Sequence, residues 1–316
     1  MVPLLRHVLA VLILPMLLVL PGCAPDPQKG LSCDLVPIAT LPITVQRGLL
    51  TVPVSINGQI VRLVVDTGAE RTTLSETASK RLKLLPDLKH ISTSMGLGGS
   101  TTNPDAVVAD FVLGNVRLPP IERVAVGRFG FEESGRLEVD GLLGADILLA
   151  FDLDIDVPGK QLTLYRVRRC LDNQPPWQEP FVAVPGVTAR KDRLLIPFRL
   201  DGQDGMAILD TGATVTTIGV QMAARLGLNE QTMALDRKIR QTGVGAGTMI
   251  GRYHWFREFR VGPAIVQGQM LTVLPTDAGV GDALIGEDFL EGRRVWMSFK
   301  TRQVFVSKLA HETAVR

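Results

Sequence analysis

The chain has 316 residues, a formal net charge of +2 and no block of Lys and Arg residues, which argues against a nucleic-acid-binding protein. Hydrophobic residues make up 46% of the chain and charged residues 21%, as is typical of globular proteins with sizeable cores. At roughly 150 residues per domain, the length predicts about two domains. The 31 Gly and 20 Pro residues predict many short strands joined by turns.

The N-terminus has the pattern of an export signal. An apolar stretch over 8–20 follows a basic start and is too short for an ordinary membrane span. It ends in Leu20-Pro21-Gly22-Cys23, which resembles a bacterial lipoprotein signal with an acylated cysteine; an ordinary signal peptide and an uncleaved anchor are alternatives. We expect a signal peptide over 1–22, a lipid anchor at Cys23 and a tether with an entering strand over 23–47. The protein is then expected in the cell envelope, on the periplasmic face, with Ala24 favouring an outer-membrane lipoprotein.

Two further cysteines, Cys33 and Cys170, flank the first half of the remaining chain. In an exported protein an even number of cysteines favours a disulfide, which here would join the two ends of that half. Two unrelated thiols are the alternative. Neither cysteine has a Cys or His neighbour at metal-ligand spacing.

An internal repeat organises the rest of the chain. Asp66-Thr67-Gly68-Ala69 recurs 144 positions later as Asp210-Thr211-Gly212-Ala213, each time after an apolar run. Around each copy the same landmarks follow in the same order. They are an Asn-Gly or Asp-Gly hairpin turn before the motif, a Thr-Thr pair after it, a short amphipathic helix over 75–84 or 219–228, a Gly-rich hairpin at 96–99 or 243–247, and an apolar pair followed by Gly at 142–144 or 284–286. We therefore predict a first lobe over 48–167, a polar, Pro-rich linker over 168–190 and a second lobe over 191–316.

These motifs resemble those of retroviral-type aspartic proteases, and two fused copies resemble the bilobal arrangement of pepsin. The resemblance extends over about 48–307 and implies a mostly β fold of two duplicated acid-protease β-barrel lobes with the active site between them. It implies an aspartic endopeptidase in which Asp66 and Asp210 activate one water molecule. Two carboxyl groups held close share a proton, so one acts as base and the other as acid. Such a reaction uses no metal or cofactor, its partner is a polypeptide substrate, and one chain suffices for the active site.

The resemblance also implies roles for the neighbouring residues. Thr67 and Thr211 would hydrogen-bond across the two loops, and Gly68 and Gly212 would allow close backbone approach. Ala69 and Ala213 replace the Ser or Thr that is usual in pepsin-like enzymes, so each carboxyl group lacks a hydroxyl donor. We therefore predict less acidic carboxyl groups than those of pepsin, with activity at mildly acidic to neutral pH.

The Gly-rich hairpins are the candidate flaps over an extended substrate, and the residues assigned to substrate binding are Glu70, Gly98, Gly99, Gly245 and Ala246. Of these, Glu70 is a candidate contact for the substrate backbone.

Other acidic residues call for a different interpretation. Asp152, Asp154 and Asp156 alternate along a predicted strand without the spacing of a calcium loop, which we interpret as a solvated face. Asp residues at 140, 146, 282 and 288 recur in both halves, and we assign them turn and capping roles. A second function also agrees with the sequence: a catalytically inactive envelope lipoprotein that uses the same groove to bind peptide segments.

Overall fold

The structure is a computed structural model that describes residues 34–119, 121–130, 138–168, 174–188, 193–245, 247–274 and 281–307. The predicted signal peptide, the lipidation site Cys23, the proposed disulfide partners Cys33 and Cys170, and Ala246 lie outside these residues. Within these ranges, no helix has the length and apolar character needed to cross a membrane.

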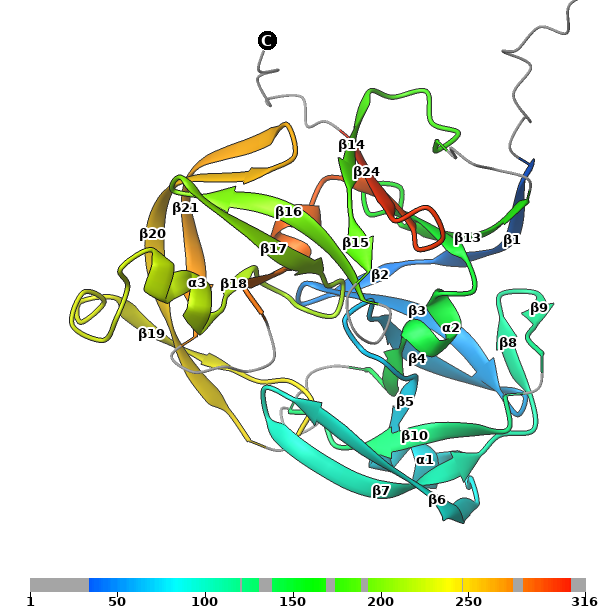
Figure 1. The fold of residues 1–316 in the computed structure, drawn as a ribbon. Helices are drawn as coiled ribbons and strands as arrows, with labels where there is room; N and C mark the ends of the chain where they lie inside the picture. The colour runs from blue at the N-terminus through cyan, green and yellow to red at the C-terminus, as the bar shows by residue number, and fades with distance from the viewer. Residues whose placement is uncertain are drawn as a thin grey trace, which may run out of the picture. The chain divides into compact units, whose positions relative to one another are not determined.

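The first lobe is mostly β, with two short helices (Figure 1). Its strands are β2 (Thr44–Gln46), β3 (Leu49–Ile56), β4 (Gln59–Val65), β5 (Thr73–Ser75), β6 (Pro86–Gly96), β7 (Gly99–Val107), β8 (Phe111–Leu113), β9 (Val116–Arg117), β10 (Arg123–Gly127) and β11 (Gly141–Leu143). Its helices are α1 (Glu76–Arg81) and α2 (Ala145–Leu148). The strands form one sheet in the order β6-β7-β10-β5-β11-β4-β3-β8-β9, with β2 paired to β3.

The second lobe repeats this plan. Its strands are β15 (Val187–Thr188), β16 (Leu194–Leu200), β17 (Gln203–Leu209), β18 (Thr217–Ile218), β19 (Arg237–Gln241), β20 (Met249–Val261), β21 (Ala264–Val273) and β22 (Ala283–Ile285), with helices α3 (Val220–Arg225) and α4 (Glu287–Leu290). The sheet order is β15-β16-β17-β22-β18-β21-β20-β19, and a further pairing of β16 with β20 closes a barrel. The predicted mostly β, two-lobed fold is confirmed.

A third sheet combines strands from both halves of the chain. It contains β1 (Asp34–Pro42), β13 (Gln161–Arg168), β12 (Asp152–Asp156), β23 (Arg294–Ser298), β24 (Gln303–Ser307) and β14 (Phe181–Pro185), in that order. The central pairing, β12 with β23, joins the two halves. The stretch assigned to a linker thus carries β14 and β15, while β1 corresponds to the entering strand.

The repeated sequence features produce the same local structures twice. Asn57-Gly58 and Asp201-Gly202 have positive φ at both residues, as two-residue hairpin turns require. In β16, Leu194, Ile196, Phe198 and Leu200 are buried in alternation, so one strand face packs into the core. The two short helices occur as α1 and α3, and the side chain of Ser75 caps α1 by accepting from the Ala78 N–H.

The expected solvated face along β12 is wrong. Asp152 and Asp154 are 4% and 2% exposed. Both oxygens of Asp154 accept from Arg294 of β23, at 2.8 Å from Nε and 2.7 Å from one terminal nitrogen. The Arg294 guanidinium also lies 5.0 Å from the ring centroid of Trp177, whose indole N–H donates to Asp154. These carboxylates therefore join the two halves within the third sheet; their partners are distant in sequence, so alternation alone could not predict burial.

Candidate active site

Two matching strand pairs present Asp66 and Asp210. β4 runs parallel to β11, and the backbone N–H of Asp66 donates to the Leu143 carbonyl at 3.0 Å. In the second lobe β17 runs parallel to β22, and the N–H of Asp210 donates to the Ile285 carbonyl at 2.9 Å. The apolar pairs of the repeat thus form the strands next to β4 and β17, and each aspartate lies directly before the turn that follows its strand.

The two Asp-Thr-Gly loops are joined by reciprocal hydrogen bonds between Thr67 and Thr211. The Thr67 hydroxyl donates to the Leu209 carbonyl at 2.6 Å and accepts from the Thr211 N–H at 3.1 Å. The Thr211 hydroxyl makes the same two contacts, with the Val65 carbonyl and the Thr67 N–H. Both threonines are buried, so these bonds fix the two loops relative to each other.

Gly68 and Gly212 each lie against the aspartate of the other lobe. A Cβ added to Gly68 would lie 2.4 Å from Cγ of Asp210, and one added to Gly212 would lie 2.3 Å from Cγ of Asp66. Neither approach leaves room for a side chain. The two carboxyl groups are therefore neighbours at the junction of the loops, as a shared site requires.

Burial raises the pKa of both carboxyl groups. For Asp66, the negative charge of Asp210 raises the pKa further, while N–H groups of Ala69 and Gly68 oppose the shift. For Asp210, the Gly212 N–H, a hydrogen bond from Asp66 and the positive charge of Arg193 all lower the pKa against burial. The two carboxyl groups therefore titrate as a unit that shares one proton, with one group ionised and the other protonated.

Further hydrogen bonds within each lobe join the segment after the Asp-Thr-Gly loop to the short helix that follows the apolar pair. Thr72 donates through its N–H and its hydroxyl to Asp146, at 2.8 and 2.7 Å, and its hydroxyl accepts from the Gly144 N–H. In the second lobe, Thr216, Asp288 and Gly286 form the same arrangement. Asp146 and Asp288 thus bind the segments that follow the loops. The predicted capping role is wrong for both residues, because Gly144 and Gly286 are the N-cap residues of α2 and α4 and neither helix has a side-chain cap. The equal spacing of these residues in both halves was the available sequence signal.

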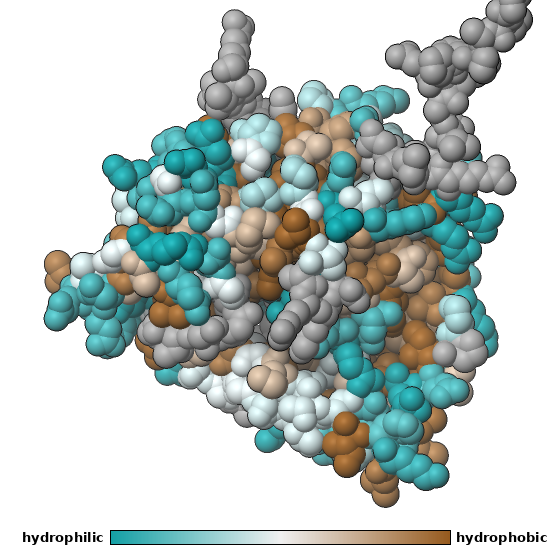
Figure 2. Space-filling model, viewed as in Figure 1, coloured by the Kyte–Doolittle hydropathy of each residue, from teal (hydrophilic) through white to brown (hydrophobic). Residues whose placement is uncertain are grey.

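The candidate flaps meet across the two lobes (Figure 1). The Gly98 N–H donates to the Val244 carbonyl at 2.9 Å, and the Gly247 N–H donates to the Gly98 carbonyl at 2.7 Å. Leu97 and Gly98 form the hairpin turn between β6 and β7, and Gly99, with φ of +101°, begins β7 opposite Gly96. The surface over this hairpin has intermediate hydropathy, in agreement with its Ser, Thr and Gly residues (Figure 2). Hydrogen bonds therefore join the Gly-rich segments of the two lobes, and we call the joined segments, 96–99 and 243–247, the roof.

Segment 128–130 of the first lobe also joins this roof. The Gly245 N–H donates to the Arg128 carbonyl and the Gly130 N–H to the Gly243 carbonyl, both at 2.9 Å. Between them Phe129 is 2% exposed and belongs to a small apolar cluster with Leu49, Val64, Val139 and Leu142, against which Ala69 and Val244 pack. An aromatic ring of the protein thus lies in the same apolar cluster as the Asp-Thr-Gly-Ala loop. No repeat counterpart marked Phe129 in the sequence.

Glu70 contacts the protein itself in this structure. Its carboxylate lies 3.3 Å from a terminal nitrogen of Arg193 in the other lobe. Position 49, which lies 144 residues before Arg193, is Leu49, so this ion pair exists in one half only. The repeat in the sequence therefore did not point to Arg193, although the positive charge of this residue lowers the pKa of Asp210.

Removing one threonine hydroxyl from the loop junction is expected to destabilise the protein. Thr211→Val would leave the Val65 carbonyl and the Thr67 N–H buried without their partner. At about 1–3 kcal/mol for each of the two unsatisfied groups, the free energy of unfolding should fall by about 2–6 kcal/mol. Urea unfolding measures this loss. Thr211→Ser keeps the hydroxyl and is the control; equal losses for Val and Ser would contradict the role of the hydrogen bonds.

Two β lobes that each contribute an Asp-Thr-Gly loop to one junction define an aspartic-protease fold. A family model described as aspartyl protease matches residues 52–147 and 196–289, more than half of the chain, and the chain belongs to this family. The crystal structure of an aspartic proteinase from Irpex lacteus has a similar fold, with a TM-score of 0.50 and 14% sequence identity. The match covers 87% of this chain and 98% of that one. Among curated proteins, no sequence matched.

Proposed function

We propose that this protein is an aspartic endopeptidase that hydrolyses peptide bonds with a water molecule activated between Asp66 and Asp210. The reciprocal packing of each loop glycine against the other aspartate supports the proposal most directly, because it brings the two carboxyl groups together. The threonine hydrogen bonds keep them in register. A buried pair that shares one proton supplies a base and an acid at the same point.

In the proposed reaction, the ionised carboxylate of the pair takes a proton from water as the water oxygen bonds to the scissile carbonyl carbon. The protonated carboxyl group of the pair gives its proton to the carbonyl oxygen, which produces a tetrahedral diol. When the diol collapses, the C–N bond breaks, the carboxyl group that took the water proton passes it to the amine nitrogen, and one diol hydroxyl returns a proton to the other carboxylate. The pair regains its original protonation state, and no covalent intermediate forms with the protein.

A mixed peptide library incubated with the purified protein in ¹⁸O-labelled water tests this function. Each cleavage should produce a new carboxyl terminus that carries one solvent oxygen, because water attacks the peptide directly. Mass spectrometry of the products gives both the cleavage sites and the label. If no peptide is cleaved above the background of the Asp66→Asn variant, the enzyme proposal fails.

The pH dependence of activity should follow the raised pKa values of the pair. Because the active form carries one proton, kcat/KM should be highest in mildly acidic to neutral solution, above the ordinary range of carboxyl groups. Ala69→Ser would place a hydroxyl donor beside Asp66, whose carboxylate already accepts from the residue 69 N–H at 2.7 Å. That variant should move the acidic limb of the profile to lower pH. A wild-type maximum near pH 2–3 would contradict this assignment.

The N-terminal sequence supports a proposed location in a bacterial cell envelope, with a lipid anchor at Cys23 and the protease on the periplasmic face of the outer membrane. The support comes from the apolar stretch and the Leu-Pro-Gly-Cys sequence that follows it. Labelled fatty acid should be incorporated into the full-length protein and lost in Cys23→Ala. Incorporation into Cys23→Ala would argue against this anchor, and membrane fractionation would separate inner from outer location.

One contact favours a second candidate function, a non-catalytic peptide-binding protein. Phe129 is buried in the apolar cluster that contains Ala69 and is held there by the bonds between segments 128–130 and 243–245. A cleft that keeps its own aromatic side chain beside the loop could bind peptides without turnover. Peptides that bind the wild type, with no labelled products from any of them, would favour this function over hydrolysis.

A further inference from the structure

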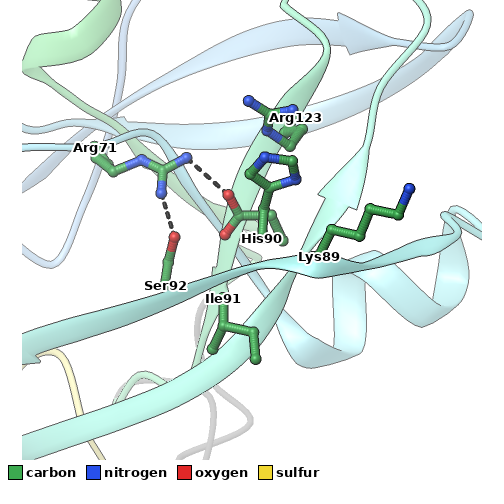
Figure 3. Close-up of a pocket in the computed structure, with 7 residues that line it drawn as sticks. Arg71, Lys89, His90, Ile91, Ser92 and Arg123 are labelled. Carbon is green, nitrogen blue, oxygen red and sulfur yellow. Dashed lines mark hydrogen bonds and ion pairs between the residues drawn. The ribbon is translucent and has the colours of Figure 1, made fainter.

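A basic pocket lies beside the shaft of the β6–β7 flap hairpin. It has a volume of about 430 Å³ and is lined by three cationic side chains, Arg71, Lys89 and Arg123 (Figure 3). His90, Ile91 and Ser92 of β6 also line the pocket, and the single carboxylate on its wall is that of Asp105 from β7. The pocket wall therefore carries more positive than negative charge, before any contribution from the imidazole.

The carboxylates around the pocket neutralise only part of this charge. Asp105 is 2% exposed and accepts from Arg71 at 3.1 Å, so one of the cations is paired within the wall. Asp87 lies 2.7 Å from the His90 ring and 3.8 Å from Arg123, and Glu122 lies 3.6 Å from Arg123; neither lines the pocket. Lys89 has no ion-pair partner among the described residues and extends from β6 in Figure 3.

Arg71 connects this pocket to the catalytic loop. It lies five residues after Asp66, so the two Cα atoms are at most about 18 Å apart. Its guanidinium donates to the Ser92 hydroxyl on β6 and to Asp105 on β7 (Figure 3). Its neighbour Glu70 contacts Arg193, whose charge acts on Asp210. The arginine thus bridges the loop that carries Asp66 and the flap hairpin.

An extended peptide advances about 3.3 Å per residue. A substrate residue three to five positions from a scissile bond held at the aspartates would therefore lie about 10–17 Å from that bond. This range falls within the limit of about 18 Å on the distance between the Cα atoms of Asp66 and Arg71. Ser92 lies four residues before Gly96, the last residue of β6 before the flap tip, which corresponds to about 13 Å along the strand. A substrate strand that runs alongside β6 beneath the flap would bring one of its outer side chains within this distance of the wall.

We infer that the pocket formed by Arg71, Lys89, Arg123, His90 and Ser92 is an outer subsite of the cleft, which accepts an Asp or Glu side chain of the substrate three to five residues from the scissile bond. This inference rests on the proposed function and specifies its substrate class: extended peptides with an acidic residue at one outer position. The guanidinium and ammonium groups are the donors that a carboxylate requires, and Ser92 can supply a further hydroxyl contact.

Peptides that differ at a single outer position test the subsite. A peptide that the protein cleaves is resynthesised with Glu, Gln or Lys at each position from three to five residues on either side of the scissile bond. At one position kcat/KM should fall about fivefold from Glu to Gln and about fivefold again to Lys, as expected for a partly exposed charge pair. The preference should shrink in about 0.5 M salt.

Lys89→Glu should abolish the preference for Glu, because it reverses the charge of the unpaired cation on the wall. Lys80→Glu, with the same charge change on the exposed side of α1 in the same lobe, is the matched control and should retain the preference. Equal kcat/KM for Glu, Gln and Lys at every outer position would overturn the subsite, as would equal effects of the two variants. Either result would leave the proposed hydrolysis standing.

Binding provides a readout that does not depend on turnover. Fluorescence anisotropy of the same labelled peptides on the Asp66→Asn variant should show the Glu preference, and its loss in Asp66→Asn combined with Lys89→Glu. If the wild type cleaves no library peptide, a library peptide that binds it is resynthesised with Glu, Gln or Lys at each position in turn. A preference for Glu that Lys89→Glu abolishes would then support the pocket as a binding site for an acidic side chain, while the proposed hydrolysis fails. Tight binding without any charge preference would overturn the subsite alone.

Discussion

Replacing Asp66 or Asp210 by asparagine is expected to lower kcat by at least about a thousandfold, because each variant removes the acid or the base of the shared-proton pair. Asparagine has nearly the same shape, so the reciprocal packing of Gly68 and Gly212 against these positions should persist. Cleavage of a library peptide, followed by mass spectrometry over long incubations, measures the loss.

The two substitutions should also leave the fold at least as stable as the wild type at neutral pH. Burial raises the pKa of both carboxyl groups, which means that their ionisation opposes folding, and asparagine removes that cost. Asp204→Asn, an exposed aspartate of the same lobe, is the control and should change neither activity nor stability. Full activity in either dyad variant would refute the assignment; lost activity with an unfolded protein would leave Asp66 and Asp210 merely structural.

Features of the site that both halves share were predictable from sequence. Asp66 and Asp210, with their Thr and Gly neighbours, occupy equal positions in two copies of one pattern, and the lobes place equal positions at one junction. The two Gly-rich hairpins also take equivalent places, since they hydrogen-bond to each other in the roof. Hairpin turns were predictable for a local reason: Asn-Gly and Asp-Gly tolerate the positive φ that such turns need.

Features that break the repeat were not predictable. Arg193 and Phe129 act at the site through contacts across the lobe junction, and neither has an equivalent in the other half. The buried state of Asp154 depends on Arg294, 140 residues further along the chain. Such long-range pairs follow from the tertiary arrangement, which the period of a strand does not encode. The asymmetry that Arg193 introduces is of this kind: its charge lowers the pKa of Asp210, and the equivalent position in the first half is Leu49.

Glu287 is a second asymmetry, and it is expected to make stability depend on pH. It begins α4, where the first lobe has Ala145, and its N–H donates to the Ala213 carbonyl of the Asp-Thr-Gly-Ala loop. The side chain is 4% exposed, and one carboxyl oxygen has no hydrogen-bond partner among the described residues. Burial, together with the charges of Glu291 and Asp288, raises its pKa from 4.5 to about 8.

Because the folded state holds this proton more tightly than the unfolded state, Glu287 favours folding fully only below about pH 4.5. Its contribution is lost progressively as pH rises towards 8, the pKa in the folded protein. The shift, 8 minus 4.5, sets an upper limit of about 5 kcal/mol, and relaxation around the charge should reduce this to about 2–3 kcal/mol. Glu287→Gln should therefore stabilise the protein at pH 8 by that amount relative to its effect at pH 4.5.

Urea unfolding of the wild type and Glu287→Gln at both pH values measures the effect, because other titrating groups cancel in the difference between the two proteins. Glu287→Ala, which copies the first lobe, should show the same pH dependence on top of a constant loss from its smaller side chain. Glu291→Gln, on an exposed neighbour, should show much less. A buried glutamate that keeps its proton requires the free energies of unfolding of the wild type and Glu287→Gln to diverge as pH rises. If the difference between these two free energies is the same at pH 4.5 and pH 8, Glu287 titrates normally and the prediction is wrong.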